Sequence, residues 1–255
     1  MTPSARPAGE KVIVVLPAYH AERTLAAVLA RIPRDHVDEL VLVDDCSRDR
    51  TAEVARELGL VVFRNERNLG YGGNLKVCLD IALARGATIV VEVHPDDQYD
   101  PSAIPDALAS ARAGHALVLG SRFTAPGLAL QHGMPRWKYL ANIGLSVIAR
   151  LVLRAALTEF HTGFRAYQRR LLERIDYHAN ADDYLFSFEV IAQARFAGLP
   201  IGEVPVTCRY YEGVTQISFG NSVRYAIGML RVLARYVLAC AGRPGPSFRL
   251  RRSDV

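Results

Sequence analysis

Polar residues of the types that bind cations follow an apolar stretch near position 90. The stretch reads VVEVHPDDQYDP (90–101), and its polar members are His94, Asp96, Asp97, Gln98 and Asp100. Residues two apart on an extended chain point the same way, so Asp96 and Gln98 are expected to face one ion. Their oxygens suit Mg²⁺ or Mn²⁺, and His94 would suit Mn²⁺ better. The alternative is an acidic loop that is solvated at a strand end.

Two earlier apolar runs also end in residues that could contact a ligand. One run ends in Pro17, Ala18 and Tyr19, and the other ends in Asp44 and Asp45. Ligands bind beyond the carboxyl ends of strands in parallel sheets, so these loops are predicted to meet the 90–101 stretch at one edge. A carboxylate there could accept from a nucleobase or a ribose hydroxyl, or it could form a turn that starts a helix.

A glycine-rich segment and scattered basic residues add candidates for phosphate contacts. Gly70, Gly72 and Gly73 could let the backbone approach a ligand or could form a tight turn, and their spacing does not fit a dinucleotide fingerprint. The basic candidates for a phosphate clamp are Arg122, Arg136, Lys138 and Arg209. Each of them taken singly fits a solvated surface charge equally well.

Three acids near a late helix are candidates for a general base. Asp182 and Asp183 precede the helix, where capping is the simpler interpretation, and Glu189 lies inside it. A general base helps when a hydroxyl group is the nucleophile of a reaction. A phosphate oxygen needs no such base, because it is already anionic near neutral pH.

The pattern of elements that must position these residues is that of an α/β protein. Strands are predicted at 11–19, 39–45, 60–65, 87–93, 115–123 and 201–210. Helices are predicted at 22–32, 47–59, 68–86, 102–113, 136–154, 184–197 and 221–241, and 124–135 is expected to be a loop. The alternation predicts a mostly parallel central sheet with helices on both faces.

Composition sets the limits on partners and compartment. The 255 residues carry a net charge of +5, which favours anionic partners, but no basic strip with interleaved aromatic residues predicts nucleic-acid binding. The four cysteines are far apart and fit a reducing, cytoplasmic compartment. We see neither a signal peptide nor an apolar run long enough to span a membrane.

Seven segments in order resemble the inverting GT-A glycosyltransferases of family 2, in the branch that acts on dolichyl or polyprenyl phosphate. The segments are VVLPAYHAERTL, LVDDCSRDRT, NLGYGGNLK, VHPDDQYDP, GSRF, HTGFRAYQRRLLE and IGEVPVTCRY. The matching segments cover about residues 11–215, which we expect to be the catalytic domain. Outside them the composition predicts a flexible 1–10, an amphipathic helix at 216–242 and a disordered basic tail at 243–255. It implies sugar transfer from a GDP- or UDP-linked donor to a polyprenyl phosphate.

The resemblance also assigns roles to residues. The donor nucleotide would lie over the ends of the first two strands and the glycine loop, and the positions implied are Pro17, Ala18, Tyr19, Asp44, Asp45, Gly70, Gly73, Lys76, Asp96 and Gln98. A divalent metal would be held by Asp96 and Gln98, and His94 replaces the usual first acid of that motif. Arg122 and Arg136 fall where the family's arginines contact phosphate. Independently of the resemblance, Lys138 and Arg209 remain candidates for the acceptor phosphate, and Asp183 and Glu189 remain catalytic candidates.

Two other functions stay open from the sequence. One is transfer to a hydroxyl of a soluble sugar, natural product or protein, with Asp182, Asp183 or Glu189 as the base. The other is a non-catalytic module that binds nucleotide sugars or anionic lipids, against which the near-intact set of site loops argues.

The last predicted helix suggests a membrane surface as a further partner. Apolar residues recur at helical spacing along 223–241, and Arg224, Arg231 and Arg235 interrupt them. Such a helix suits the plane of an anionic membrane surface on the cytoplasmic side. The alternative is packing on the globular domain or on a second protomer, which would make the protein a homo-oligomer.

Overall fold

A seven-stranded sheet forms the centre of the computed structural model, which describes residues 6–125, 127–210 and 219–251. The strand order is β3-β2-β1-β4-β6-β5-β7, and within the described residues only β6 runs antiparallel to its neighbours. The strands are β1 Val12–Ala18, β2 Glu39–Asp44, β3 Val61–Arg64, β4 Ile89–Glu92, β5 Leu117–Ser121, β6 Arg165–Gln168 and β7 Ile201–Pro205. The predicted mostly parallel α/β sheet is therefore confirmed.

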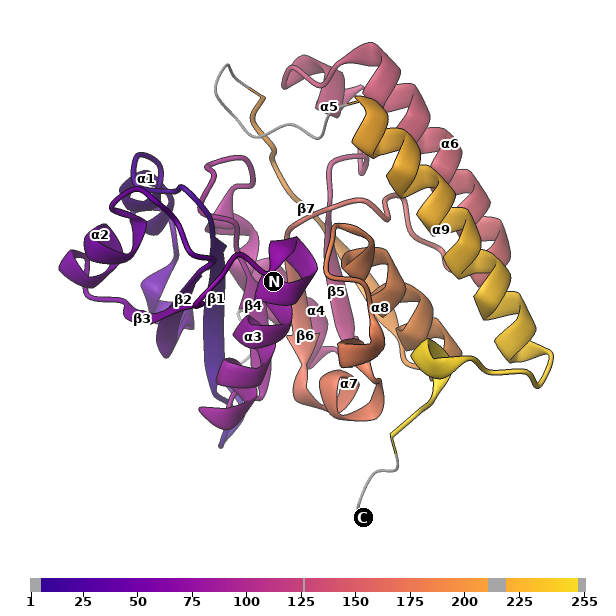
Figure 1. Cartoon of the computed structure of the whole chain (residues 1–255), viewed down its shortest axis with the longest axis horizontal. Coiled ribbons are helices and arrows are strands. Elements are labelled where there is room, and N and C mark those ends of the chain that lie inside the picture. Colours follow the sequence, from indigo (N-terminus) through magenta and orange to yellow (C-terminus); the bar gives the residue numbers. More distant parts are fainter. Residues whose placement is uncertain (1–5, 126, 211–218, 252–255) are drawn as a thin grey trace.

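Helices cover both faces of this sheet (Figure 1). They are α1 Leu25–Leu29, α2 Thr51–Glu57, α3 Gly70–Ala84, α4 Ile104–Arg112, α5 Leu128–Gln131, α6 Arg136–Leu153, α7 Arg169–Arg174, α8 Leu185–Phe196 and α9 Phe219–Cys240. Short 3-10 turns lie at Arg34–His36, Pro101–Ala103, Tyr177–Ala179 and Pro246–Phe248. The strand β6 and the short α5 were not predicted, because each has four residues and gives little periodic signal.

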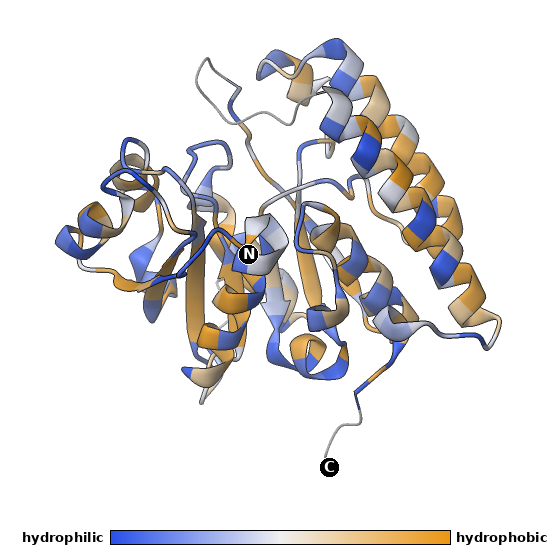
Figure 2. Ribbon diagram, in the orientation of Figure 1, coloured by the Kyte–Doolittle hydropathy of each residue, from blue (hydrophilic) through white to orange (hydrophobic). Residues whose placement is uncertain are grey.

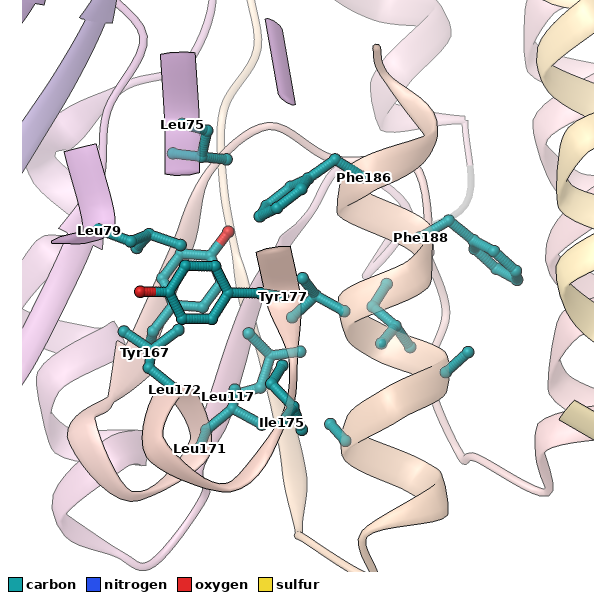
Figure 3. Close-up of a cluster of buried hydrophobic side chains, with 14 of the residues drawn as sticks. Leu75, Leu79, Leu117, Tyr167, Leu171, Leu172, Ile175, Tyr177, Phe186 and Phe188 are labelled. Atoms are coloured by element: carbon teal, nitrogen blue, oxygen red, sulfur yellow. The ribbon is translucent and has the colours of Figure 1, made fainter. Parts of the chain in front are cut away.

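The core has two layers because successive side chains of a strand point to opposite faces of a sheet. Ile13 and Val15 of β1 pack with residues of α3, α7 and α8, whereas Val14 and Leu16 pack with residues of α1 and α4. Figure 3 shows the first layer, where Leu75 and Leu79 of α3 and Phe186 and Phe188 of α8 belong to one buried cluster on the same side of the sheet. Burial on both faces explains why β1 reads as a continuous apolar run.

The described residues near both ends, 6–10 and 243–251, contact the rest of the protein. Phe248 is buried against the rings of Phe196 and Tyr236, and Arg251 pairs with Asp176 at 2.8 Å. The prediction of a disordered tail is wrong for Arg243–Arg251, because one aromatic side chain anchors that segment in the core. At the other end Glu10 pairs with Arg112, so residues 6–10 are not a free arm.

Helix α9 has one face on the protein and one face exposed. Its buried residues include Met229, Val232 and Leu233, which belong to the core, so the helix does pack on the globular domain. Its outer side joins that of α6, which lies beside it (Figure 1). Among the described residues no helix is long and apolar enough to cross a membrane.

The start of α3 packs so closely on another segment that only glycine fits there. A Cβ on Gly72 would lie 2.4 Å from the carbonyl oxygen of Ala181 and 2.8 Å from Cβ of Phe186. We therefore expect Gly72→Ala to lower the free energy of unfolding by about 2–3 kcal/mol, since backbone cannot move aside cheaply. Urea denaturation measures this loss.

A matched control is available in another helix. A Cβ on Gly144 of α6 meets nothing within 4 Å, so Gly144→Ala should stabilise the protein by about 0.5–1 kcal/mol. Equal effects of the two substitutions would contradict the close approach at Gly72.

Candidate active site

A cavity of about 1240 Å³ lies beyond the carboxyl ends of the strands. The chain reverses its direction across the sheet between β1 and β4, and such a reversal is where parallel sheets open a ligand crevice. The ends of β1 and β4, the starts of α3 and α8, and the helices α6 and α9 contribute residues to its wall. Of the strand-end residues predicted to bind a nucleotide, Pro17, Ala18, Tyr19 and Asp45 line it.

The segment that follows β4 is a turn and not an extended strand. Asp97 has a left-handed backbone (φ 62°), and the amide of Gln98 donates to Oδ1 of Asp96 at 3.1 Å. Helix α1 holds the turn, because Thr24 donates to the carbonyl of Pro95 and Arg31 pairs with Asp97. The alternation argument for Asp96 and Gln98 was therefore wrong, although both side chains line the cavity.

The donor set at this turn suits a hard divalent cation. A carboxylate and an amide oxygen beside an open cavity leave coordination positions for phosphate oxygens. Among the described residues, no group of three or more His, Cys, Asp and Glu side chains could hold a metal ion. At this turn Asp96 and the side-chain amide oxygen of Gln98 are therefore the candidates to hold the ion.

The two aspartates that end β2 have different roles. Asp45 accepts from the amides of Leu69 and Gly70 and from Nδ2 of Asn65, at 2.8 to 3.0 Å. Asp44 is buried, lies 3.2 Å from Nε of Arg64 and is not part of the cavity wall. Both carboxylates therefore organise the loops, and the predicted contact of these residues with the donor stays a prediction.

The glycine loop approaches a protein segment. The amides of Gly72 and Gly73 donate to the carbonyl oxygen of Asp182 at 2.8 and 3.3 Å. Lys76 donates to the carbonyl of Asn180 at 2.5 Å and pairs with Asp182 at 2.7 Å. Lys76 is not part of the cavity wall, so its predicted contact with the donor is not supported. The loop instead joins α3 to the start of α8.

Arg122 is committed to a buried ion pair. It is 5% exposed, and its Nε lies 2.8 Å from Oε1 of Glu159, which is fully buried. Its other nitrogens donate to the hydroxyl of Tyr210 and the carbonyl of His161. Burial would lower the pKa of Arg122, but the charge of Glu159 raises it well above the ordinary value. Arg122 touches the cavity, yet the hydrogen-bonding capacity of its guanidinium is largely used within the protein.

The other basic candidates differ in whether they line the cavity. Arg136 and Arg209 are exposed and lie outside the cavity wall, whereas Lys138 lines it. Burial, followed by the nearby charge of Arg122, lowers the pKa of Lys138. Its ammonium lies 5.5 Å from the ring centre of Tyr210, and no carboxylate pairs with it among the described residues. An anion that enters the cavity would find this cation available.

The candidate bases are largely structural. Asp183 accepts from the amide of Leu185 at 2.9 Å and so caps α8, although it also reaches the cavity wall. Glu189 is buried outside the wall and accepts from the amide of Ala181 at 2.7 Å. Burial raises the pKa of Glu189. Asp182, the third candidate, lines the cavity but pairs with Lys76, so the role of a general base stays a prediction for these acids.

A buried carboxylate beneath the cavity was missed by the sequence analysis. Glu92 at the end of β4 has no exposed surface and accepts from Tyr71, Tyr167 and His94 at 2.8, 2.5 and 2.8 Å. Burial would raise the pKa of Glu92, but the hydrogen bond and charge of His94 outweigh it and hold that pKa below its ordinary value. The same pair raises the pKa of His94 against the effect of burial.

Tyr71 and Arg165 also line the cavity, although the sequence analysis did not predict them as site residues. Each lies within a segment that the sequence analysis quoted only as a whole. Tyr71 stands in the glycine segment, and its ring is stacked on His94 with centroids 5.4 Å apart. Arg165, in the segment HTGFRAY, donates to the carbonyls of Thr162 and Ser187.

Together the fold and the cavity define an α/β protein with a ligand crevice at the carboxyl edge of its sheet. Residues 13–176 match the family description "Glycosyl transferase family 2". The chain belongs to this family of glycosyltransferases and has the GT-A fold, as the sequence predicted.

Relatives of known activity cover most of the chain. The dolichyl-phosphate hexose transferase of Haloferax volcanii is 33% identical over 206 residues, which are 80% of this chain and 85% of that protein. The polyprenol monophosphomannose synthase of Mycolicibacterium smegmatis is 28% identical over 230 residues, which are 86% of this chain and 84% of that protein. The glucosyl-3-phosphoglycerate synthase of Mycobacterium tuberculosis, in complex with Mn²⁺, UDP and glucosyl-3-phosphoglycerate, is 21% identical, covers 94% of this chain and 82% of that chain, and has a TM-score of 0.66.

The buried ion pair makes Arg122 important for the stability of the fold. Arg122→Ala would leave the carboxylate of Glu159 unpaired in the interior, so we expect a loss of about 3–5 kcal/mol in the free energy of unfolding. Arg136→Ala, at an exposed position, should change this free energy by no more than about 0.5 kcal/mol. Chemical denaturation of both variants measures the difference, and similar losses would contradict it.

Proposed function

We propose that this protein transfers a sugar, with inversion, from a nucleoside diphosphate sugar to the phosphate of a polyprenyl phosphate. The observation that carries the proposal is the position of Lys138. This half-buried lysine lines the cavity on α6 next to Trp137, and no carboxylate pairs with it within the described part of the chain. Arg23, Arg122 and Arg165 also line the cavity, but Lys138 lies on α6 among apolar side chains, where a cation fits a phosphate attached to a lipid chain.

The strand-end loops support the donor site that we propose. Pro17, Ala18 and the exposed ring of Tyr19 form the wall near Asn68, which leaves room for a nucleotide, linked as GDP or UDP. Asp96 and Gln98 would hold Mg²⁺ or Mn²⁺, and such an ion supplies the positive charge that stabilises the leaving diphosphate. The Mn²⁺ and UDP in the complex of the mycobacterial synthase support this assignment by analogy of fold.

A phosphate acceptor also agrees with the state of the acids. A phosphate oxygen is anionic near neutral pH and attacks without losing a proton, whereas a hydroxyl acceptor benefits from a general base. Glu189 lies outside the cavity wall and Asp183 caps α8, so the candidates for a base have other tasks. This arrangement favours the lipid phosphate over the hydroxyl acceptors that the sequence left open.

The outer side of α6 and α9 is the surface that we propose to rest on a membrane. Exposed apolar side chains follow both helices, as the orange outer faces in Figure 2 illustrate. They are Trp137, Leu140, Ile143, Val147, Ile148, Leu151, Val223, Ile227, Leu230, Val237 and Leu238. Trp137, Ile148 and Val223 also line the cavity, so the apolar face is continuous with the site. Exposed arginines on α9 suit anionic headgroups on the cytoplasmic side.

The role of Lys138 is tested by kinetics. Lys138→Met keeps the stem and removes the charge, so KM for polyprenyl phosphate should rise at least about tenfold, equivalent to ~1.4 kcal/mol. KM for the donor should change little. Lys138→Arg should keep part of the affinity, and Arg136→Met, outside the cavity wall on the same helix, should behave as wild type. An unchanged acceptor KM in Lys138→Met would remove the observation on which the proposal rests.

Membrane contact is tested by flotation with phosphatidylglycerol-containing vesicles. The chain should float at low salt, and the double variant Leu140→Gln/Leu151→Gln should not, because these side chains are 68% and 72% exposed on α6. The control Leu58→Gln/Phe63→Gln changes exposed apolar residues elsewhere. Deletion of residues 221–255 would not test membrane contact alone, because α9 and Phe248 contribute to the core and their loss would destabilise the fold. Equal flotation of both double variants would contradict the assigned face.

A further inference from the structure

His94 stands where the family's metal motif usually has an acid, and the structure fixes its ring firmly. Its side chain is 15% exposed, and Nε2 lies 2.8 Å from Oε1 of the buried Glu92. The hydroxyl of Tyr71 donates to that same oxygen, and the ring of Tyr71 is stacked on the imidazole with an interplanar angle of 8°. A carboxylate accepts only, so Nε2 carries the proton and is the donor.

The other nitrogen of this ring is open to the cavity. The Nε2 and Cδ2 edge of His94 faces Glu92 and Gly163, where a Cβ on Gly163 would lie 3.2 Å from both ring atoms. Nδ1 is on the remaining side of the ring and has no hydrogen-bond partner among the described residues. It is not among the buried polar atoms that lack a partner, so it is accessible from the cavity that His94 lines.

This is the arrangement in which proteins present histidine to a metal ion. A ligating histidine almost always donates its second N–H to a carboxylate, which fixes the tautomer and aims the lone pair of the other nitrogen. Glu92 supplies such a carboxylate, and Tyr71 and Tyr167 hold it in turn. The turn at 95–97 then brings Asp96 and Gln98 to the same cavity wall.

We propose that His94 binds the divalent metal ion through Nδ1, together with Asp96 and Gln98, and that Glu92 positions the imidazole. The inference deepens the proposed function, on which its biological meaning rests. The proposed metal site then has three protein ligands, which are the imidazole nitrogen of His94, the carboxylate of Asp96 and the side-chain amide oxygen of Gln98. A site with an acid at position 94 would have oxygen ligands only.

The ligand types predict which metal is preferred. Imidazole raises affinity for Mn²⁺ and later transition metals relative to Mg²⁺, which prefers oxygen ligands only. The ratio of Mn²⁺ to Mg²⁺ affinity should therefore depend on the residue at position 94. A purely structural His94 would not affect that ratio.

The test uses the full-length protein and the metal alone. Calorimetric titration should show that His94→Ala weakens Mn²⁺ binding at least about tenfold, and Glu92→Gln about 10–100-fold. His94→Asp should restore binding but lower the Mn²⁺ to Mg²⁺ affinity ratio at least about tenfold. The control His178→Gln removes a histidine that lies outside the cavity and faces Asp80, so Mn²⁺ affinity should not change.

A spectroscopic readout separates ligation from indirect effects. Electron spin echo modulation of bound Mn²⁺ should reveal a coordinated ¹⁴N in the wild-type protein and none in His94→Asp, with circular dichroism confirming that each variant is folded. Absence of ¹⁴N coupling, or unchanged Mn²⁺ affinity in a folded His94→Ala, would overturn the proposal. Weakened binding of nucleoside diphosphate without metal in that variant would assign His94 to the diphosphate instead. A wild-type protein that binds Mn²⁺ through nitrogen but transfers no sugar to polyprenyl phosphate would refute only the proposed function.

Discussion

One buried carboxylate requires several hydrogen bonds, and the centre of this molecule is built around the groups that donate them. Glu92 has no exposed surface at the end of β4, and an ionised group there is tolerable only with several hydrogen bonds. Its three donors come from α3, β6 and the turn after β4, so a single side chain ties three elements together directly below the cavity. Loss of any donor would cost stability and would also release the ring of His94.

A second theme is that most charges near the cavity neutralise one another. Arg122 pairs with Glu159, Lys76 with Asp182 and Arg64 with Asp44, and these pairs join the site loops to one another. Lys138 differs because burial already lowers its pKa and no carboxylate offsets its charge among the described residues. A ligand phosphate would supply the missing negative charge, which links the electrostatics of the fold to the chemistry proposed for it.

The sequence predicted the sheet and its ligand-bearing edge well, because apolar runs such as 11–19 end in polar residues whose meeting is dictated by parallel packing. It could not predict partners far apart in the chain. Arg122 resembled a phosphate ligand until Glu159, thirty-seven positions later, was found beside it. The local backbone conformation could not be predicted either, because the left-handed conformation of Asp97 produces a turn where an extended segment was expected. Glu92 and β6 were missed because a lone acid in an apolar run and a four-residue strand give no periodic signal.

The central claim is that the acceptor atom is an oxygen of a lipid phosphate. Product analysis tests it most directly: the protein is incubated with nucleoside diphosphate sugars, Mn²⁺ and either a polyprenyl phosphate or the matching polyprenol, and the products are identified by mass spectrometry and NMR. The account predicts a sugar joined through a phosphodiester to the polyprenyl chain, with the anomeric configuration of the donor inverted, and no product from the polyprenol. Transfer to the polyprenol, or to a soluble hydroxyl acceptor in preference to the lipid phosphate, would contradict it.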